Sequence, residues 1–231
     1  NYFGNDNLSD YGYGGTFSVT GGVYSAKPAA KYIAAGYKVI EENGKYNVVP
    51  DAVDDVVSST ETLKEAIEAG NDTIALSAGE YIIPAAAKGK TVKFVGTGNP
   101  EDTKVAVTKV GTGGENCDYG LDGSTVTLEN ITITTNSSIY IGYARCNGTY
   151  KNCIINGTYT LYGDSVFEDC TFNVSGDVYN IWTWGAPTAT FTRCTFNCDG
   201  KAMLLYGTAN TKLTMNNCVF NDNGSISGKA A

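Results

Sequence analysis

The sequence predicts an all-β solenoid, in which the chain winds into stacked coils whose strands run parallel. The first observation behind this prediction is a repeat in the second half of the chain. Dipeptides that end in glycine recur at Tyr119-Gly120, Ile141-Gly142, Tyr162-Gly163, Trp184-Gly185 and Tyr206-Gly207. These glycines are 22, 21, 22 and 22 residues apart, and a fixed period of about 20 to 50 residues is typical of units that must stack to bury a core.

The second observation is a six-residue motif in which apolar and polar positions recur in the same order. It occurs at residues 128–133, 150–155, 167–172, 191–196 and 215–220. Its β-branched and aromatic side chains favour strands. No repeat has room for a helix of about ten residues, so each repeat is expected to contribute short strands and turns.

Stacked coils lie about 4.8 Å apart, so equivalent residues of successive repeats are expected to form columns. Two columns are expected to face inward: Ile131, Cys153, Cys170, Cys194 and Cys218, and then Ile133, Ile155, Phe172, Phe196 and Phe220. A polar column is expected at a corner, formed by Asn130, Asn152, Asp169, Arg193 and Asn217. Asparagine in such a column can cap backbone groups and the amide of its neighbour.

Strands of the type Asn-Cys-x-Phe, stacked into Asn and Cys columns, resemble the right-handed parallel β-helix of the pectin-lyase-like superfamily. The resemblance covers the chain from about Thr60 to Asn221. The stretch from Leu63-Lys64-Glu65-Ala66-Ile67 to Phe94-Val95-Gly96 is similar to the start of such domains. The resemblance therefore implies a single-stranded right-handed parallel β-helix over residues 59–231, plugged at its start by a capping helix.

The capping helix and the residues before it have recognisable start and stop signals. Thr62-x-x-Glu65 is expected to be the capping box of the helix, which Gly70 ends. Residues 1–58 are expected to form a small α/β module, joined to the solenoid by an acidic linker at 51–59.

Within this module we expect a strand at 16–19, a short helix over 29–35 and a hairpin at Asn43-Gly44. The module looks like short units of surface proteins from gut Gram-positive bacteria. That likeness implies an extracellular or cell-surface location.

The charge and composition of the chain argue against some classes of binding partner. A net charge of −8 and a pI of about 4.5 argue against nucleic acid and anionic membranes, and no apolar run is long enough to span a bilayer. The absence of an initiator Met and of a leader is typical of a processed or excised piece. The tail from Gly224 to Ala231 is too small and polar to cover the last coil, so we expect a continuation of the chain or an oligomer contact at that end.

The cysteine and histidine content indicates the redox state of the thiols and limits metal and cofactor binding. Four of the seven cysteines fall in one inward column, which favours reduced core thiols over disulfides. No cofactor or metal is expected, because the chain has no histidine and no Cys-x-x-Cys pair.

The candidate catalytic residues are the carboxylates and the two arginines, Arg145 and Arg193. The missing histidine excludes Ser-His and Cys-His pairs, and the Arg-x-Pro-x-x-Arg motif that the resemblance would supply for a lyase is missing. Asp164, Asp169 and Arg193 match the residue types of an esterase of the superfamily, without its surrounding motifs. A glycosidase pair would come from Asp118, Asp122, Glu168 and Asp169, with Asp164 a weaker candidate. The interpretation we favour is that these carboxylates are solvated or cap turns.

Aromatic residues offer a binding surface. Tyr119, Ile141, Tyr162, Trp184 and Tyr206 share one position of the repeat, with Tyr140 and Trp182 close by. Facing outward, Tyr140, Tyr162, Trp182, Trp184 and Tyr206 would stack on sugar rings; facing inward, they would be core. The preceding column, Asp118, Tyr140, Leu161, Thr183 and Leu205, includes an aspartate that is costly to bury, which favours rings inside.

The function that fits best is a non-catalytic extracellular or cell-surface protein for adhesion or carbohydrate binding. One alternative is a polysaccharide lyase or glycoside hydrolase acting on acidic plant or host glycans. Another is a structural spacer of a phage tail fibre or surface stalk.

Overall fold

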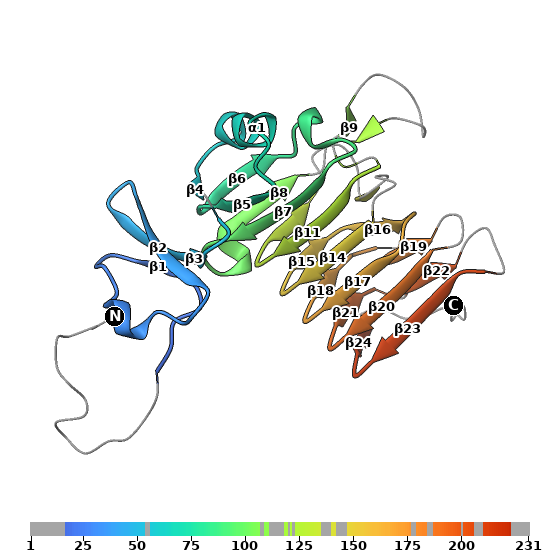
Figure 1. Ribbon diagram of the computed structural model, residues 1–231. Coiled ribbons are helices and arrows are strands. Elements are labelled where there is room, and N and C mark those ends of the chain that lie inside the picture. Colours follow the sequence, from blue (N-terminus) through green and yellow to red (C-terminus); the bar gives the residue numbers. More distant parts are fainter. Residues whose placement is uncertain are drawn as a thin grey trace, which may run out of the picture.

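A computed structural model describes residues 17–53, 56–106, 109–110, 118–119, 121, 123–134, 140–141, 147–176, 179–183, 187–199, 201–205 and 210–222. Figure 1 shows an elongated stack of parallel strands that follows the sequence from the N-terminal coils to β23 and β24. A small antiparallel sheet lies beside the N-terminal end of the stack. The predicted all-β solenoid is confirmed.

Three parallel sheets form the walls of the solenoid. The eight-stranded sheet consists of β4 (Val56–Val57), β5 (Thr73–Leu76), β7 (Thr91–Gly96), β11 (Thr125–Glu129), β14 (Asn147–Lys151), β17 (Ser165–Glu168), β20 (Thr188–Thr192) and β23 (Lys212–Asn216). The seven-stranded sheet consists of β6 (Gly79–Ile82), β8 (Thr103–Ala106), β12 (Thr132–Thr134), β15 (Ile154–Asn156), β18 (Thr171–Asn173), β21 (Thr195–Cys198) and β24 (Val219–Asp222). The four-stranded sheet consists of β13 (Tyr140–Ile141), β16 (Thr158–Leu161), β19 (Ile181–Thr183) and β22 (Met203–Leu205).

The inward columns predicted from the six-residue motif are confirmed. Ile133, Ile155, Phe172, Phe196 and Phe220 are successive partners in the seven-stranded sheet. The rings of Phe172 and Phe196 stack with centroids 4.8 Å apart, and Phe196 and Phe220 do the same. Burial of each such ring stabilises the fold by about 1.5–3 kcal/mol, so stacking in register is itself a large part of the core energy.

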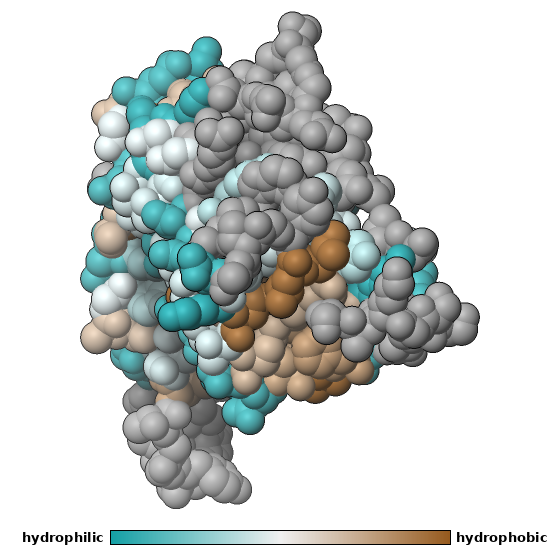
Figure 2. Space-filling view, turned by 90° about the vertical axis from the view of Figure 1, so that its right-hand side faces the viewer, coloured by the Kyte–Doolittle hydropathy of each residue, from teal (hydrophilic) through white to brown (hydrophobic). Residues whose placement is uncertain are grey.

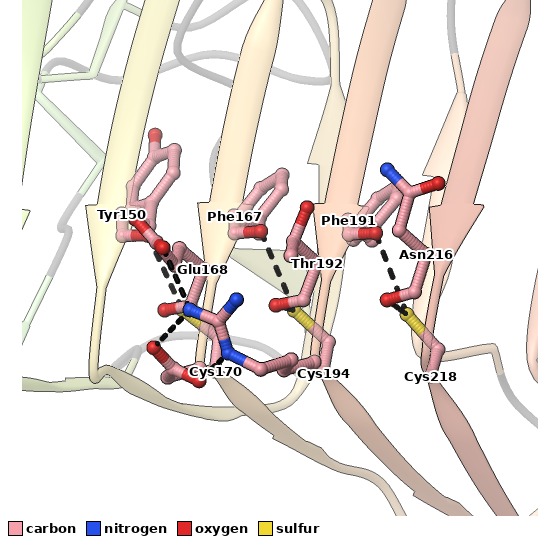
Figure 3. A network of polar contacts seen from close by, with 11 residues as sticks. Tyr150, Phe167, Glu168, Cys170, Phe191, Thr192, Cys194, Asn216 and Cys218 are labelled. Carbon is pink, nitrogen blue, oxygen red and sulfur yellow. Dashed lines mark hydrogen bonds and ion pairs between the residues drawn. The ribbon is translucent and has the colours of Figure 1, made fainter.

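The cysteine column lies where the eight-stranded sheet turns into the seven-stranded one. Cys153, Cys170 and Cys194 are buried, and Cys218 in the last coil is half-buried. Each thiol donates to a carbonyl of the preceding coil, for example Cys194 Sγ to Phe167 O at 3.6 Å (Figure 3). All five cysteines that the structure describes are free thiols, in agreement with reduced core cysteines.

The polar corner column is also confirmed, and its cause is a backbone turn. Asn130, Asn152, Asp169, Arg193 and Asn217 all have φ between +48° and +57°. This left-handed conformation suits Gly, which has no Cβ, and Asn and Asp, whose short polar side chains tolerate it. The Asn152 amide also donates to Asn130 Oδ1 at 2.9 Å, as expected for neighbours in a column.

The register of the four-stranded sheet confirms the glycine-based alignment for Leu161, Thr183 and Leu205 and corrects it for the coil before them. Ile141 pairs with Tyr159 rather than Tyr162, and Tyr140 pairs with Thr158 rather than Leu161. Asp118 and Tyr119 form β10 (Asp118–Tyr119), which pairs antiparallel with β9 (Lys109–Val110) outside the three parallel sheets.

The six-residue motif gives the true register. Its first residues, Leu128, Tyr150, Phe167, Phe191 and Met215, are successive partners 22, 17, 24 and 24 residues apart. Coil length therefore varies along the solenoid.

Helix α1 (Thr60–Glu68) covers the N-terminal end of the solenoid (Figure 1) and buries Leu63 and Ile67. Its capping box starts three residues earlier than predicted. Ser59 is the N-cap: its Oγ accepts from Thr62 N at 3.1 Å, and Thr62 Oγ1 accepts from Ser59 N at 3.1 Å. Threonine at the third helical position thus replaces the Glu of the usual pattern. Short 3₁₀ turns follow at η3 (Ala85–Ala87) and η4 (Pro100–Asp102).

The N-terminal sheet contains β1 (Val23–Tyr24), β2 (Tyr37–Glu42) and β3 (Lys45–Pro50). The predicted hairpin is confirmed, since β2 and β3 pair across Asn43 and Gly44, which have φ of +50° and +70°. The predicted helix over 29–35 shrinks to η2 (Ala30–Tyr32) because Ile33 enters a bridge with Val19. That bridge is what remains of the strand expected at 16–19, whose first residue lies outside the described part.

The expectation of a linker over residues 51–59 is wrong for Val56 and Val57. Val56 and Val57 form β4, which pairs with β5 in the solenoid. Val53 and Val56 pack with Val49 and Ala75 in a small apolar cluster, because an acidic stretch that carries valines can still bury them. The boundary between residues 58 and 59 stays a prediction.

Candidate functional site

Arg193 binds both acidic residues at the same corner one coil earlier. Its Nε donates to Asp169 Oδ1 at 2.7 Å, and its Nη2 donates to Asp169 Oδ2 at 2.8 Å and to Glu168 Oε1 at 2.7 Å (Figure 3). The hydrogen bonds from Arg193 hold the pKa of Asp169 below its usual value. The hydrogen bonds to Asp169, and to a smaller extent the one to Glu168, raise the pKa of Arg193. An ionised carboxylate and a protonated guanidinium are poorly suited to general acid or base chemistry near neutral pH.

Asp164 lies at the other end of strand β17. Its Oδ1 accepts from Thr188 N at 2.8 Å, and its own N donates to Asn147 Oδ1 at 3.0 Å. Five residue steps along an extended strand separate it from Asp169, which is about 16 Å. The structure therefore brings Asp169 and Arg193 together and keeps Asp164 apart, at more than the spacing of a glycosidase pair. Asp118 lies in β10, and Asp122 lies outside the described residues.

Asp164 belongs instead to a groove on the outward face of the eight-stranded sheet. This threonine groove has a volume of about 330 Å³ and is lined by Thr125, Asn147, Thr149, Asp164, Thr188 and Thr190. The side chain of Val166, which is 46% exposed, lies among them.

Strand register explains the groove. Thr127, Thr149, Val166, Thr190 and Thr214 are successive partners on β11, β14, β17, β20 and β23. They alternate with buried residues such as Leu128 and Phe167, so they face outward, one per coil. Sequence reasoning missed this column, although the alternation in Thr125-x-Thr127 and Thr188-x-Thr190-x-Thr192 was a usable signal.

The predicted aromatic residues do not all share one register. Trp182 lies between Thr160 and Leu204 in the four-stranded sheet and is half-buried. Ile181 beside it is in the core, so Trp182 lies on the opposite face of the sheet, where its partner Thr160 is buried as well. Tyr162 is half-buried and follows Leu161, two residues after the partner of Trp182.

The remaining aromatic candidates lie at positions whose side chains are not described. The structure places Tyr140 on β13, whose side chains are not described, while Trp184 and Tyr206 lie outside the described residues. The aromatic residue that occupies the core here is Tyr159, which contacts the hydroxyl of Tyr150 and packs edge-on against Phe167. Tyr159 was not among the predicted residues.

A second asparagine ladder was also missed. Asn156, Asn173, Asn197 and Asn221 donate amide to amide from coil to coil at 2.8–2.9 Å. Each lies three residues after a column cysteine, which was the available signal. The ladder satisfies polar groups at the end of the seven-stranded sheet and thus fixes the coils in register.

Within the described residues, no three His, Cys, Asp or Glu side chains gather in a way that could hold a metal ion. The same part of the chain contains no helix with the length and apolarity needed to cross a membrane.

Comparison with known families supports the fold on independent grounds. A family model described as a right-handed beta helix region matches residues 103–230, more than half of the chain. Comparisons with curated proteins and with solved structures give no match. The matched segment contains the confirmed inward columns and the corner turns, and the chain therefore belongs to the right-handed β-helix family.

Proposed function

We propose that the chain is a non-catalytic extracellular or cell-surface β-helix protein that binds carbohydrate in the threonine groove. The observation that carries this proposal is the repetition of hydroxyl and amide side chains across consecutive coils on one rigid face. Sugar hydroxyls both donate and accept, and Thr and Asn side chains do the same. The exposed Val166 offers an apolar surface to the C–H face of a sugar ring.

The charge of the chain favours a neutral polysaccharide. A net charge of −8 repels acidic polymers at long range, and Asp164 is the charged residue among those named for the groove. A carboxylate in a groove of hydroxyls is a good acceptor for two neighbouring sugar hydroxyls.

The alternative of a polysaccharide lyase or glycoside hydrolase has less support. Of the residues named for it, Asp169 and Arg193 neutralise each other, and Asp164 lies at the far end of the strand. A purely structural spacer remains the other alternative, because stacked coils are stable without any ligand.

Binding and turnover separate these alternatives. We would measure retention of the protein by insoluble xylan, cellulose and mannan, together with the release of reducing ends and unsaturated products. Thr190→Trp fills the groove and is expected to weaken retention strongly. Thr214→Trp, at the same column position on β23 but outside the groove, is the matched control and is expected to bind normally. Product release would contradict the non-catalytic assignment, and no retention on any polymer would favour the spacer.

The C-terminal coil forms part of the same proposal. Leu205, Val219 and Phe220 are each half-exposed there, and Figure 2 shows an apolar surface at this end of the molecule. A further coil or a second subunit that covered these side chains would bury them and pair the open strand edges.

A further inference from the structure

A second and larger groove lies between the N-terminal sheet and the corner turns of the solenoid. We call it the junction groove; its volume is about 880 Å³. One wall contains Thr20, Tyr24 and Asn43, and the other contains Asn99, Asn130 and Asn152. The volume falls within the range of about 300–1,000 Å³ that is typical of small-molecule sites.

The two walls are joined by a packed apolar contact. Val49 of β3 packs with Val53, Val56 and Ala75, and all four are buried. Contacts of this kind hold the groove open in the absence of a ligand, which lowers the cost of binding.

The solenoid wall presents carboxamides at its corner. Asn152 Nδ2 donates to Asn130 Oδ1 at 2.9 Å. This bond uses one of the two amide hydrogens of Asn152 and one lone pair of the Asn130 oxygen. The pair therefore offers both donor and acceptor capacity to a ligand, which is what vicinal sugar hydroxyls require.

The wall formed by the N-terminal residues carries aromatic rings, one of which packs against the backbone. Phe17 lines the groove and is 54% exposed, and the Tyr24 hydroxyl donates to Gly21 O at 2.8 Å. A Cβ at Gly22 would lie 2.9 Å from Tyr24 Oη, so only glycine lets this ring lie against the backbone. Such rings provide flat faces for sugar C–H groups.

We propose that the junction groove binds a short neutral oligosaccharide, at a site separate from the threonine groove. A peptide added as an extra strand fits less well, because β1, the edge strand of the N-terminal sheet that lines the groove, has two residues. Amides, hydroxyls and rings line the groove together with a few small apolar side chains, and Glu42, Asp102 and Lys45 are its charged groups. This mixture suits a polyhydroxylated ligand without net charge.

The experiment uses the full chain with Thr190→Trp already in place, so that the threonine groove is filled and does not contribute. Xylohexaose, cellohexaose and mannohexaose are titrated separately by calorimetry. At least one of them is expected to bind with one-to-one stoichiometry. In this background Thr20→Trp, which adds a large ring to an exposed groove residue, is expected to abolish the binding.

A second pair of variants tests the carboxamides without straining the backbone. Asn130→Gly combined with Asn152→Gly removes both amides, and glycine tolerates φ of +57° and +48° at these corners. We expect binding to weaken roughly tenfold or more.

Asn217→Gly, with φ of +54° at the same corner outside the groove, is the matched control and is expected to leave affinity unchanged. Absence of binding by all three hexasaccharides would overturn the proposal. Binding that survives Thr20→Trp and the paired glycine variants would overturn it as well. Because the effect of Thr190→Trp on retention by polymers tests the threonine groove separately, failure of one proposal is distinguishable from failure of the other.

Discussion

Arg193 and Asp169 occupy the same corner of consecutive coils and are joined by two hydrogen bonds of 2.7 and 2.8 Å. Both residues have φ of +54°. Aspartate tolerates this conformation, whereas arginine adopts it at a cost in backbone energy. The ion pair thus fills two positions of the corner column, and asparagine occupies the other three.

Backbone strain at Arg193 can be measured by comparing two substitutions. Arg193→Ala and Arg193→Gly remove the same ion pair, but only glycine relieves the left-handed conformation. We expect Arg193→Gly to be more stable than Arg193→Ala by about 1 kcal/mol, as measured by urea unfolding. Equal stabilities would show that the corner accommodates a Cβ without strain.

The ion pair also predicts a dependence of stability on pH. Hydrogen bonding to Arg193 lowers the pKa of Asp169 from its ordinary value of 3.8. The stabilisation is therefore fully present above pH 3.8 and is lost as the pH falls through the lower pKa of the folded state. We expect the difference in Tm between the parent chain and Asp169→Asn to be constant above this range and to shrink below it. A difference that stays constant down to the lowest pH at which the chain folds would contradict the assignment.

The thiol column predicts selective protection from alkylation. The hydrogen bond with Cys153 and then burial raise the pKa of Cys170, and the hydrogen bond with Cys170 and then burial raise that of Cys194. Since the thiolate is the reactive form, both should react slowly with iodoacetamide at pH 8.

Cys218, which is half-buried in the last coil, provides the internal comparison. We expect Cys218 to react roughly ten times faster or more than Cys170, as followed peptide by peptide with mass spectrometry. Similar rates at the two positions, in chain that stays folded, would mean that the column is open to solvent.

Sequence patterns predicted the register only where packing fixes the spacing. Phe172 and Phe196 stack in the core and Asn130 and Asn152 bond at the corner, so these positions recur faithfully whatever the coil length. The dipeptide Ile141-Gly142 begins beyond those constraints, and Ile141 pairs with Tyr159, 18 residues later, instead of with Tyr162. From Leu161 to Thr183 and Leu205 the glycine period and the strand register agree, so the period predicted the register in the later coils only.

The junction groove could not be predicted from the sequence, for a different reason. Its walls come from segments as distant as Thr20 and Asn152, and no repeat or motif links them. The threonine groove was predictable in principle, because the register that aligns the core residues of successive strands also aligns their outward residues. The polar positions that alternate with the core residues of each strand carry this information.

Gly148 is a position at which a single added methyl group is expected to disturb the core. It faces inward on β14, between Val126 and Ser165 in the stacked column, and the Tyr150 ring folds over it toward Tyr159. A Cβ at this position would overlap the Tyr150 ring.

We therefore expect Gly148→Ala to destabilise the chain by about 1–3 kcal/mol, measured by urea unfolding. Gly21→Ala, where no atom lies within 4 Å of the added Cβ, is the control and should have little effect. The cause is tested by a double-mutant cycle with Tyr150→Leu, which removes the ring. If the clash is the cause, Gly148→Ala costs much less in the Tyr150→Leu chain than in the parent. An unchanged cost would place the effect in the backbone of β14 instead.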